Sequence, residues 1–430
     1  MKPLFFLFGC CFLISAVFPQ STDIPEVSLS YSFNGNYTLV ERSNWSKYQN
    51  GKYIGLTHNE TRARVKATGE NPKGQEFSGF FYVLEETLRD MAKTSRSIDE
   101  INETAFTVLP DGTMQFSADS GYPRLRGFPV FPDTRIKPGD RWQAEGVRII
   151  DPKRDGKTSA LPILVEYTFS GKEEYRNIPV YRIKARYATR INKYNKNRSD
   201  DPDLVNATGT HEADILVNAE NGSIVLILDR LDETFYYADG TNIRYKGNTA
   251  MFTEIPVPVQ KEILVKELET ITSDAAKKHE SGGSGSNRGN LSGQIQNKLN
   301  GKTPDADSPF SVEETAQGIR LSMKNIHFQA DTAVILDDET WRLDAIAEAL
   351  RLAPKNQYLV EGHTASTGDP AAEKRLSEER AKKIIDELVK RGLHAEQFMY
   401  TGYGGTRPAA GNNTEEGRAQ NRRVEITILE

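Results

Sequence analysis

The stretch Glu361-Gly362-His363-Thr364-Ala365-Ser366-Thr367-Gly368, followed by Leu376-Ser377-Glu378-Glu379-Arg380-Ala381, decides how the last third of this chain folds. The apolar residues Tyr358 to Val360 precede it and are typical of a short buried strand. After it, Ala381, Ile384, Ile385 and Leu388 recur at helical spacing. Ser377 is a favourable N-cap residue, and Glu378 and Glu379 suit the positive first turn. The sequence therefore predicts a strand, a loop and a helix that begins at Ser377 and ends at Gly392.

Strand and helix patterns continue to alternate on both sides of this stretch, from Gly318 onward. Ile319, Leu321 and Met323 alternate as in a strand, and Leu343, Ile346 and Leu350 form one face of a helix that stops before Pro354. Phe398 to Thr401 and Val424 to Ile428 supply further strands. The order strand, helix, strand, helix, strand, strand predicts an α+β domain with a mixed sheet and both helices on one face.

Four short motifs follow one another in this region: Gly362-His363-Thr364, Leu376-Ser377 with Arg380-Ala381, Gly402-Tyr403-Gly404, and Asn421-Arg422-Arg423-Val424-Glu425. Because the OmpA-like domain family has the same motifs in the same order, residues from about 317 to 430 resemble that family. The resemblance implies the fold of that family and a place in the bacterial envelope, where members hold peptidoglycan non-covalently by its stem peptide. It also implies the ligand-binding positions, which are Thr364 and Ala365 on the loop and Arg380 on the helix.

Two family positions differ in this chain, and both affect charge. Family members use a loop aspartate to receive the ammonium group of the diamino acid in the stem peptide, and an arginine to pair with its carboxylate. Arg380 is that arginine by position, but Ala365 replaces the aspartate and Glu373 replaces a usual asparagine. Losing one member of a charged pair typically costs about 2–5 kcal/mol, on the order of 30-fold to several-thousand-fold in affinity.

Two interpretations of this site follow. In the favoured one, the stem-peptide site is degenerate and peptidoglycan binding is weak or lost. In the alternative, the domain is a working anchor in which Asp369 or Glu373 replaces the missing acid, although Glu373 could also pair with Arg380 and block it. The other motif residues are interpreted as structural, with Arg422 or Arg423 able to border the pocket; they are Gly362, His363, Asn421, Arg422 and Arg423.

Residues from about 24 to 270 have the pattern of β structure. Tyr181 to Tyr187 alternates apolar and basic residues, and a meander is expected from Ile215–Val217, Ile224–Leu228 and Phe235–Tyr237. A helix is expected from about Tyr82 to Lys93. Five dipeptides favour tight turns: Asn34-Gly35, Asn50-Gly51, Asp111-Gly112, Asn221-Gly222 and Asp239-Gly240. Prolines between Phe128 and Pro132 suggest a boundary, which gives two β-rich domains, 24–135 and 136–270; a single larger domain is the alternative.

The remaining segments are expected to be a signal peptide and a linker. Residues 1–21 contain Lys2, an apolar run from Leu4 to Phe18 and polar residues after it, as in a secretory signal. Retention as an anchor and acylation at Cys10 are the alternatives. Residues 271–308 include Ser281-Gly282-Gly283-Ser284-Gly285-Ser286, so they are expected to be a flexible linker that decouples the orientation of the OmpA-like domain, 309–430, from the rest.

Composition and motif content favour an envelope scaffold or binding protein over an enzyme. The formal net charge of -5 does not favour a nucleic-acid partner, and the six histidines have no metal-ligand spacing. Nucleophile-elbow, zinc-protease and phosphate-loop motifs are absent, so no catalytic residue, metal or cofactor is predicted. The expected location is the periplasm, near the outer membrane, with peripheral membrane association as an option. The expected partners are peptidoglycan or other envelope proteins.

Three competing interpretations concern residues 24–270. They are a hydrolase without a recognisable motif, a barrel of membrane-spanning strands, and a module that recruits partners at its sheet edges. The expected helix near Leu84, the prolines from Pro129 to Pro138 and the irregular spacing of turns argue against membrane-spanning strands.

Overall fold

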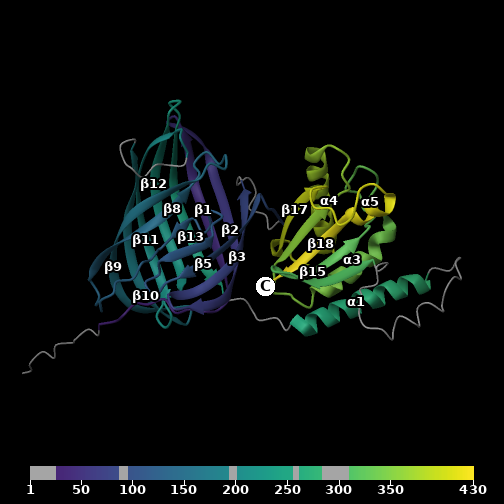
Figure 1. The fold of residues 1–430 in the computed structure, drawn as a ribbon, viewed down its shortest axis with the longest axis horizontal. Helices are drawn as coiled ribbons and strands as arrows, with labels where there is room; N and C mark the ends of the chain where they lie inside the picture. The colour runs from purple at the N-terminus through teal and green to yellow at the C-terminus, as the bar shows by residue number, and fades with distance from the viewer. Residues whose placement is uncertain (1–25, 87–94, 193–200, 255–260, 283–308) are drawn as a thin grey trace, which may run out of the picture.

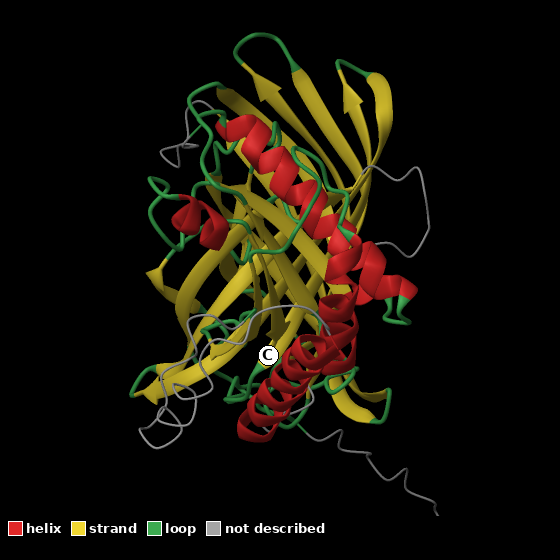
Figure 2. Cartoon of the chain, turned by 90° about the vertical axis from the view of Figure 1, so that its right-hand side faces the viewer, coloured by secondary structure: helices red, strands yellow, loops and turns green. Residues whose placement is uncertain are grey.

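The computed structural model describes residues 26–86, 95–192, 201–254, 261–282 and 309–430. These residues form two sheets that lie side by side, with the helices on the outer side of the second sheet (Figures 1 and 2). The predicted signal peptide and residues 283–308 of the predicted linker lie outside the described residues. None of the described helices combines the length and the apolar sequence that a membrane crossing requires.

The first sheet has twelve strands in the order β6-β5-β3-β2-β1-β13-β12-β11-β10-β9-β8-β7, and every neighbouring pair is antiparallel. It curls into a nearly closed wall, called the curved sheet below (Figure 1). Its strands are β1 (Tyr37–Gln49), β2 (Lys52–Asn71), β3 (Gly74–Glu86), β5 (Glu100–Val108), β6 (Met114–Ala118), β7 (Leu125–Arg126), β8 (Arg141–Ile150), β9 (Ser159–Tyr175), β10 (Ile178–Asn192), β11 (Leu204–Asn218), β12 (Ile224–Tyr237) and β13 (Asn242–Glu254).

The curved sheet runs through both predicted β-rich domains without a break. The proline-containing segment at the expected boundary lies inside the sheet, because Phe128 and Phe131 are buried in one core with Val165, Tyr167 and Ile183. The expected boundary near Pro132 therefore does not divide this sheet: β1–β3 and β5–β13, all between Tyr37 and Glu254, form one sheet. The prolines interrupt regular structure, as expected, but Phe128 and Phe131 pack the segment against the core of the curved sheet.

Four of the five predicted turn dipeptides join consecutive strands. Asn50-Gly51 links β1 to β2 with positive φ angles of 50° and 77°, the backbone that asparagine and glycine tolerate best. Asp111-Gly112, Asn221-Gly222 and Asp239-Gly240 also lie between strands, whereas Asn34-Gly35 only precedes β1. The predicted meander is partly wrong, because Phe235–Tyr237 is the end of β12 and not a third strand.

The outer face of the curved sheet is rich in charge. Along β10, Ile183, Ala185 and Tyr187 point into the core, and the basic residues between them point outward. Arg182 pairs with Glu173 on β9 at 2.8 Å and with Asp214 on β11 at 3.2 Å. On the next strands Arg244 pairs with Asp232 at 2.6 Å. Such exposed pairs add little stability, but a face with this charge density is expected to face water.

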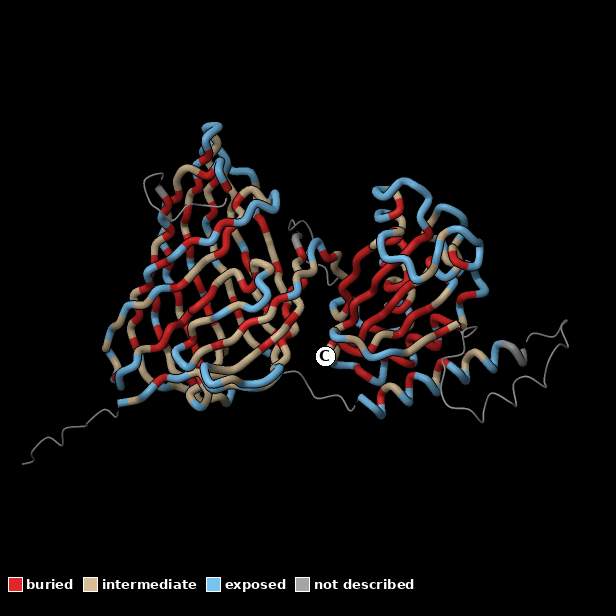
Figure 3. Tube along the Cα trace, in the orientation of Figure 1, coloured by how far each residue is buried: buried red, intermediate tan, exposed pale blue. Residues whose placement is uncertain are grey.

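The second sheet has six strands in the order β14-β15-β18-β16-β17-β4 (Figure 3 shows its dense burial). Helices α3 and α4 contact each other and share one apolar core with the sheet, which confirms the expected mixed sheet covered by helices. The elements are α1 (Lys261–Gly282), β14 (Phe310–Glu314), β15 (Gly318–Lys324), η2 (Asp337–Glu339), α3 (Thr340–Leu350), β16 (Tyr358–His363), α4 (Pro370–Lys390), η3 (Ala395–Gln397), β17 (Phe398–Gly404), α5 (Glu415–Asn421) and β18 (Arg423–Leu429), with β4 (Arg96–Ser97) at the edge.

Helix α1 belongs to this second core. Leu264 and Leu268 are buried among the apolar residues of α3 and the sheet, and the ring of His279 stacks on Trp341 with centroids 4.5 Å apart. Residues 271–282, predicted as the first part of the linker, are therefore helical, and Ile271 and Ala275 pack against this core. The polar exposed face of the helix explains why its sequence resembles a linker.

Strand β4 connects the two sheets, although it comes from the first half of the chain. It pairs in parallel with β17, and the Ile98 amide donates to the Tyr400 carbonyl oxygen at 2.8 Å. Ile98 is buried in a cluster shared by both sheets, which consists of Tyr82, Leu84, Ile98, Leu359, Met399 and Leu429 and is called the bridging cluster below. This contact fixes one sheet against the other, which differs from the predicted decoupled orientation. The predicted helix over Tyr82–Lys93 is also wrong up to Glu86, since these residues are in β3, and residues 87–94 lie outside the described residues.

Candidate functional site

The loop with the first motif lies tightly against helix α4. A Cβ at Gly362 would overlap the carbonyl oxygen of Ser377, so only glycine fits there. The Thr364 amide donates to the Gly404 carbonyl oxygen at 2.9 Å, and Ala365 is buried. The His363 ring stacks on Tyr403, and its nitrogens have no hydrogen-bond partner among the described residues. Burial lowers the pKa of His363 to about 3, so this histidine is uncharged at neutral pH.

Helix α4 begins at Pro370, earlier than the predicted start at Ser377. The side chain of Asp369 is the N-cap and accepts a hydrogen bond from the Ala372 amide at 3.1 Å, and proline suits the first helical position. Arg380 therefore lies well inside the helix. Since the dipole effect fades within the first turn, the positive end of the helix does not assist Arg380 in attracting an anion.

Ser377 instead joins the helix to the Gly402-Tyr403-Gly404 turn. Its side chain is fully buried, donates to the Lys374 carbonyl oxygen at 2.8 Å and accepts from the Gly404 amide at 2.9 Å. This bond holds the turn against α4 at the place where the loop residue Thr364 also bonds Gly404.

Ser377→Ala is expected to lower the free energy of unfolding by about 1–3 kcal/mol, because the buried Gly404 amide would lose its acceptor. Urea unfolding of the full chain measures this difference. The matched control is Ser170→Ala on the exposed face of β9, where a change within about 0.5 kcal/mol is expected. Equal stability of the two variants would show that the bond contributes nothing.

The Glu373 carboxylate accepts hydrogen bonds from the backbone of the loop. It accepts from the backbone amides of Thr367, of Gly368 at 2.9 Å and of Gly405 at 3.3 Å. Burial alone would raise the pKa of Glu373, but these donors outweigh it and the pKa is lowered. Glu373 therefore closes the loop onto the turn and does not pair with Arg380, so the predicted blocking pair is not formed.

Arg380 is buried beside a different part of the chain. Its Nε donates to the Thr332 carbonyl oxygen at 3.0 Å, and its guanidinium lies over the Phe328 ring at 4.7 Å from the centroid. Burial lowers the pKa of Arg380, while the charge of Asp331 acts in the opposite direction. A cavity of about 430 Å³ opens next to it, lined also by His327, Phe328, Glu415 and Arg422.

The predicted ligand positions do not all line the cavity beside Arg380. Only Arg380 among them lines the cavity beside α4, and Thr364, Ala365, Asp369 and Glu373 do not. Sequence reasoning missed Phe328, His327 and Glu415 as neighbours of Arg380. Arg422 also lines this cavity, whereas Arg423 is not among its lining residues.

The Asn421-Arg422-Arg423 motif has structural partners. Asn421 is fully buried, and its Oδ1 accepts from the amides of Ala409 and Ala410 at 2.7 and 2.9 Å. Arg422 pairs with Glu415 at 2.7 Å, and Arg423 pairs with Glu425 at 2.6 Å. The asparagine fixes the segment before β18, and both arginines make ion pairs within the domain.

One group of described residues has ligand atoms close enough together for a metal ion. His327 Nδ1 lies 3.1 Å from Asp338 and 3.3 Å from Glu339. Glu339 already pairs with Arg342 at 3.0 Å and accepts from the His327 amide, so its charge is neutralised inside the protein. These residues fit a hydrogen-bonded loop better than a metal site.

Comparison with known proteins supports the assignment of this domain. Residues 327–422 match the sequence model of the OmpA family. Over 119 residues the chain is 37% identical to the probable lipoprotein YiaD of Escherichia coli (strain K12). This match covers 27% of this chain and 54% of the relative. Over 103 residues it is 37% identical to the peptidoglycan-binding protein ArfA of Mycobacterium bovis, covering 24% and 32%.

A solved structure is similar to part of the chain. The crystal structure of the peptidoglycan-associated lipoprotein from Burkholderia pseudomallei is 25% identical and covers 25% of this chain and 87% of that one, with a TM-score of 0.23. The chain spans about half or less of the length of the curated relatives named above. The four motifs, the mixed sheet under two helices and the family match agree, and the last third of this protein is an OmpA-like domain.

Proposed function

We propose that this protein is a structural or adhesive component of the bacterial envelope, located in the periplasm, whose OmpA-like domain has a degenerate site for the peptidoglycan stem peptide. The observation that carries this proposal is the state of the two acids that could replace the missing aspartate. The Glu373 carboxylate is filled by loop amides, and the Asp369 side chain caps α4. Neither acid lines the cavity beside Arg380.

The cationic half of the site also differs from what a zwitterion requires. Arg380 is held by the Thr332 carbonyl oxygen and the Phe328 ring, and the loop residue that faces the ligand in the family is the apolar Ala365. A ligand ammonium group placed there would lose water without gaining an opposite charge. A stem peptide would therefore be bound through one charge only, which supports weak or lost binding.

The names of the relatives and the connection between the two sheets support a structural role in the envelope. One relative is named a peptidoglycan-binding protein and another a probable lipoprotein. The curved sheet and the OmpA-like domain are joined by the bridging cluster and β4, as suits a rigid adaptor between envelope components. Other envelope proteins are the proposed partners, at or near the outer membrane.

Co-sedimentation with purified peptidoglycan tests the proposal. The natural chain is expected to remain mostly in the supernatant, and Ala365→Asp is expected to increase binding at least about 10-fold, because an acid regained in this pair is worth about 2 kcal/mol or more. Adding Arg380→Ala to Ala365→Asp should remove the gain, which makes it the matched control. The proposal fails if the natural chain pellets with peptidoglycan and Arg380→Ala abolishes that binding.

A further inference from the structure

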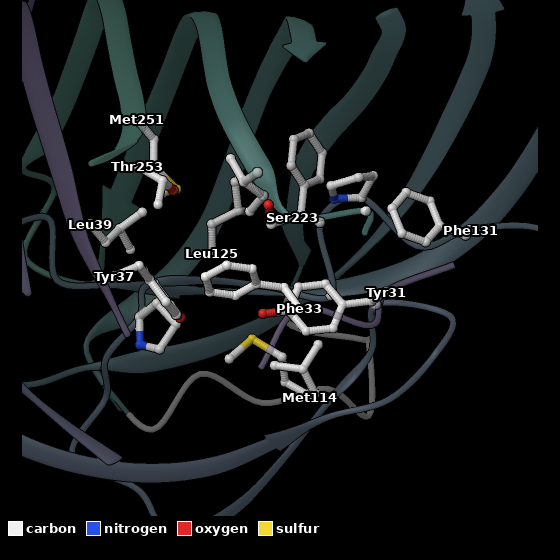
Figure 4. A pocket seen from close by; sticks show the side chains of 18 residues that line it. Tyr31, Phe33, Tyr37, Leu39, Met114, Leu125, Phe131, Ser223, Met251 and Thr253 are labelled. Atoms are coloured by element: carbon white, nitrogen blue, oxygen red, sulfur yellow. The ribbon is translucent and has the colours of Figure 1, made fainter. Parts of the chain in front are cut away.

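The interior of the curved sheet contains two adjoining cavities of different character. The first, of about 80 Å³, is apolar and lined by aromatic and aliphatic side chains such as Tyr31, Phe33, Leu39, Met114 and Phe131 (Figure 4). The second is larger, about 360 Å³, and has a mixed lining. Leu125 and Met251 line both, so the cavities meet at these two residues. They adjoin there and are together called the interior cavity below, with the first as its apolar end and the second as its polar end.

The polar end has an excess of negative groups. Six carboxylates and three guanidinium groups line it: Glu41, Asp99, Glu100, Asp151, Asp229 and Glu233, with Arg124, Arg148 and Arg154. Arg148 is already neutralised, because it makes a two-point pair with Glu233 at 2.8 and 3.1 Å. Without this pair, the carboxylates still outnumber the guanidinium groups, so the electrostatic potential at the polar end favours a cation over an anion.

Asp229 has an unused acceptor at this end. Its Oδ2 accepts from the Tyr187 hydroxyl at 2.7 Å and lies 2.9 Å from His211 Nδ1. Its Oδ1 is buried and has no hydrogen-bond partner among the described residues, and the residue as a whole is only 6% exposed. A buried carboxylate oxygen without a donor is costly, so a donor supplied by a ligand would be stabilised there.

We propose that the interior cavity binds a single-chain amphiphile whose head group carries an ammonium group. The chain occupies the apolar end past Leu125 and Met251, and the ammonium group donates to Asp229 Oδ1 at the acidic end. The small apolar volume favours one chain over two. Burial and the charge of Asp229 raise the pKa of Glu41, and an adjacent ammonium group opposes this shift. The site is separate from Arg380 and does not depend on peptidoglycan binding.

Calorimetric titration of the full chain tests this site with two probes of equal chain length, decylammonium and decanoate, each below its micelle concentration. Decylammonium is expected to bind saturably and at least about 10-fold more tightly than decanoate. Leu125→Trp, which fills the junction, is expected to weaken decylammonium binding at least 10-fold. The matched control is Leu164→Trp on the outer face of β9, where the leucine is 59% exposed and binding should not change.

The head-group part of the proposal has its own variant. Asp229→Asn is expected to reduce the preference for decylammonium over decanoate at least fivefold, and Glu41→Gln serves the same purpose if Asp229→Asn does not fold. Circular dichroism of each variant shows whether the curved sheet is intact. The proposal is overturned if neither probe binds saturably, if decanoate binds as tightly as decylammonium, or if Leu125→Trp binds like Leu164→Trp.

Discussion

Ile98→Asp is expected to lower the free energy of unfolding by about 3–5 kcal/mol, because it places a carboxylate in the bridging cluster. Ile98 is 5% exposed, and its neighbours Leu359, Met399 and Leu429 are all nearly fully buried. None of these neighbours offers a hydrogen bond or a positive charge. The variant either keeps the carboxylate buried and loses stability, or releases β4 from β17 and separates the sheets.

Urea unfolding measures the loss of stability, and small-angle X-ray scattering measures the separation of the sheets. Release of β4 is expected to enlarge the radius of gyration, because the bridging cluster is an apolar contact between the two sheets. Ile54→Asp is the matched control, since Ile54 is 55% exposed on β2 and should tolerate the charge. If Ile98→Asp and Ile54→Asp have the same stability and size in solution, the two sheets are not held together by this cluster.

Glu60→Gln is expected to lower the free energy of unfolding by about 3 kcal/mol, because it removes the carboxylate that pairs with three arginines. Glu60 on β2 is 1% exposed and pairs with Arg42 at 2.8 Å, with Arg96 at 2.5 Å and with Arg62. Arg96 lies on β4, so the same acid also supports the contact between the sheets. Breaking a buried pair on one side leaves uncompensated charge, which costs about 3–5 kcal/mol, and the partial exposure of the arginines reduces this.

The same residue gives a pH dependence. Burial alone would raise the pKa of Glu60, but Arg62, Arg96 and Arg42 outweigh it and lower the pKa from 4.5 to about 2. Because the folded pKa is below the unfolded one, this stabilisation is fully present above pH 4.5 and is lost as the pH falls toward 2. At about 1.4 kcal/mol per pKa unit, about 3 kcal/mol depends on this ionisation.

Acid titration of the unfolding free energy checks this prediction. Glu60→Gln should have a flatter pH dependence than the natural chain between pH 4.5 and 2. Glu212→Gln is the control, because Glu212 is 63% exposed and its pair with Arg186 contributes at most about 1 kcal/mol. A natural chain and a Glu60→Gln variant with parallel pH profiles would contradict the assignment.

The second sheet and its helices were predictable because each element has one buried face. Leu343, Ile346 and Leu350 pack on the sheet from α3, and Ile384, Ile385 and Leu388 pack on it from α4, so helical spacing reports directly on burial. The start of α4 was misplaced because Ser377 has the chemistry of an N-cap, but Asp369 with Pro370 forms the actual one. Two competing caps in one segment cannot be ranked without the tertiary contact between Ser377 and Gly404.

Strand β3 was mistaken for a helix because both of its faces are buried. Phe81 packs inside the curved sheet, whereas Tyr82 and Leu84 pack outward in the bridging cluster. The second set of contacts comes from residues far away in the sequence, so the strand lacks the alternation of a half-exposed strand. The absence of a boundary near Pro132 has a similar cause, since only the folded core shows that Phe128 and Phe131 anchor the segment.

The candidate site was predictable in its residue types but not in its geometry. The substitution at Ala365 is visible in the sequence, and so is the presence of nearby acids. That Glu373 is consumed by backbone amides depends on the path of the loop, which no local pattern specifies. The interior cavity was not predicted at all, because its lining comes from strands that are adjacent only after the sheet has curled.

The pairing of β4 with β17 also constrains the order in which the molecule can be completed. Residues near Ser97 leave the ribosome long before residues near Tyr400, yet each provides the other with an edge partner. Tyr82 and Leu84 therefore have no cover while the rest of the chain is being made, and contacts this distant in sequence form slowly. During this interval the incompletely synthesised chain exposes an apolar patch that can associate with other chains. Its yield in a cell therefore depends on protection by chaperones.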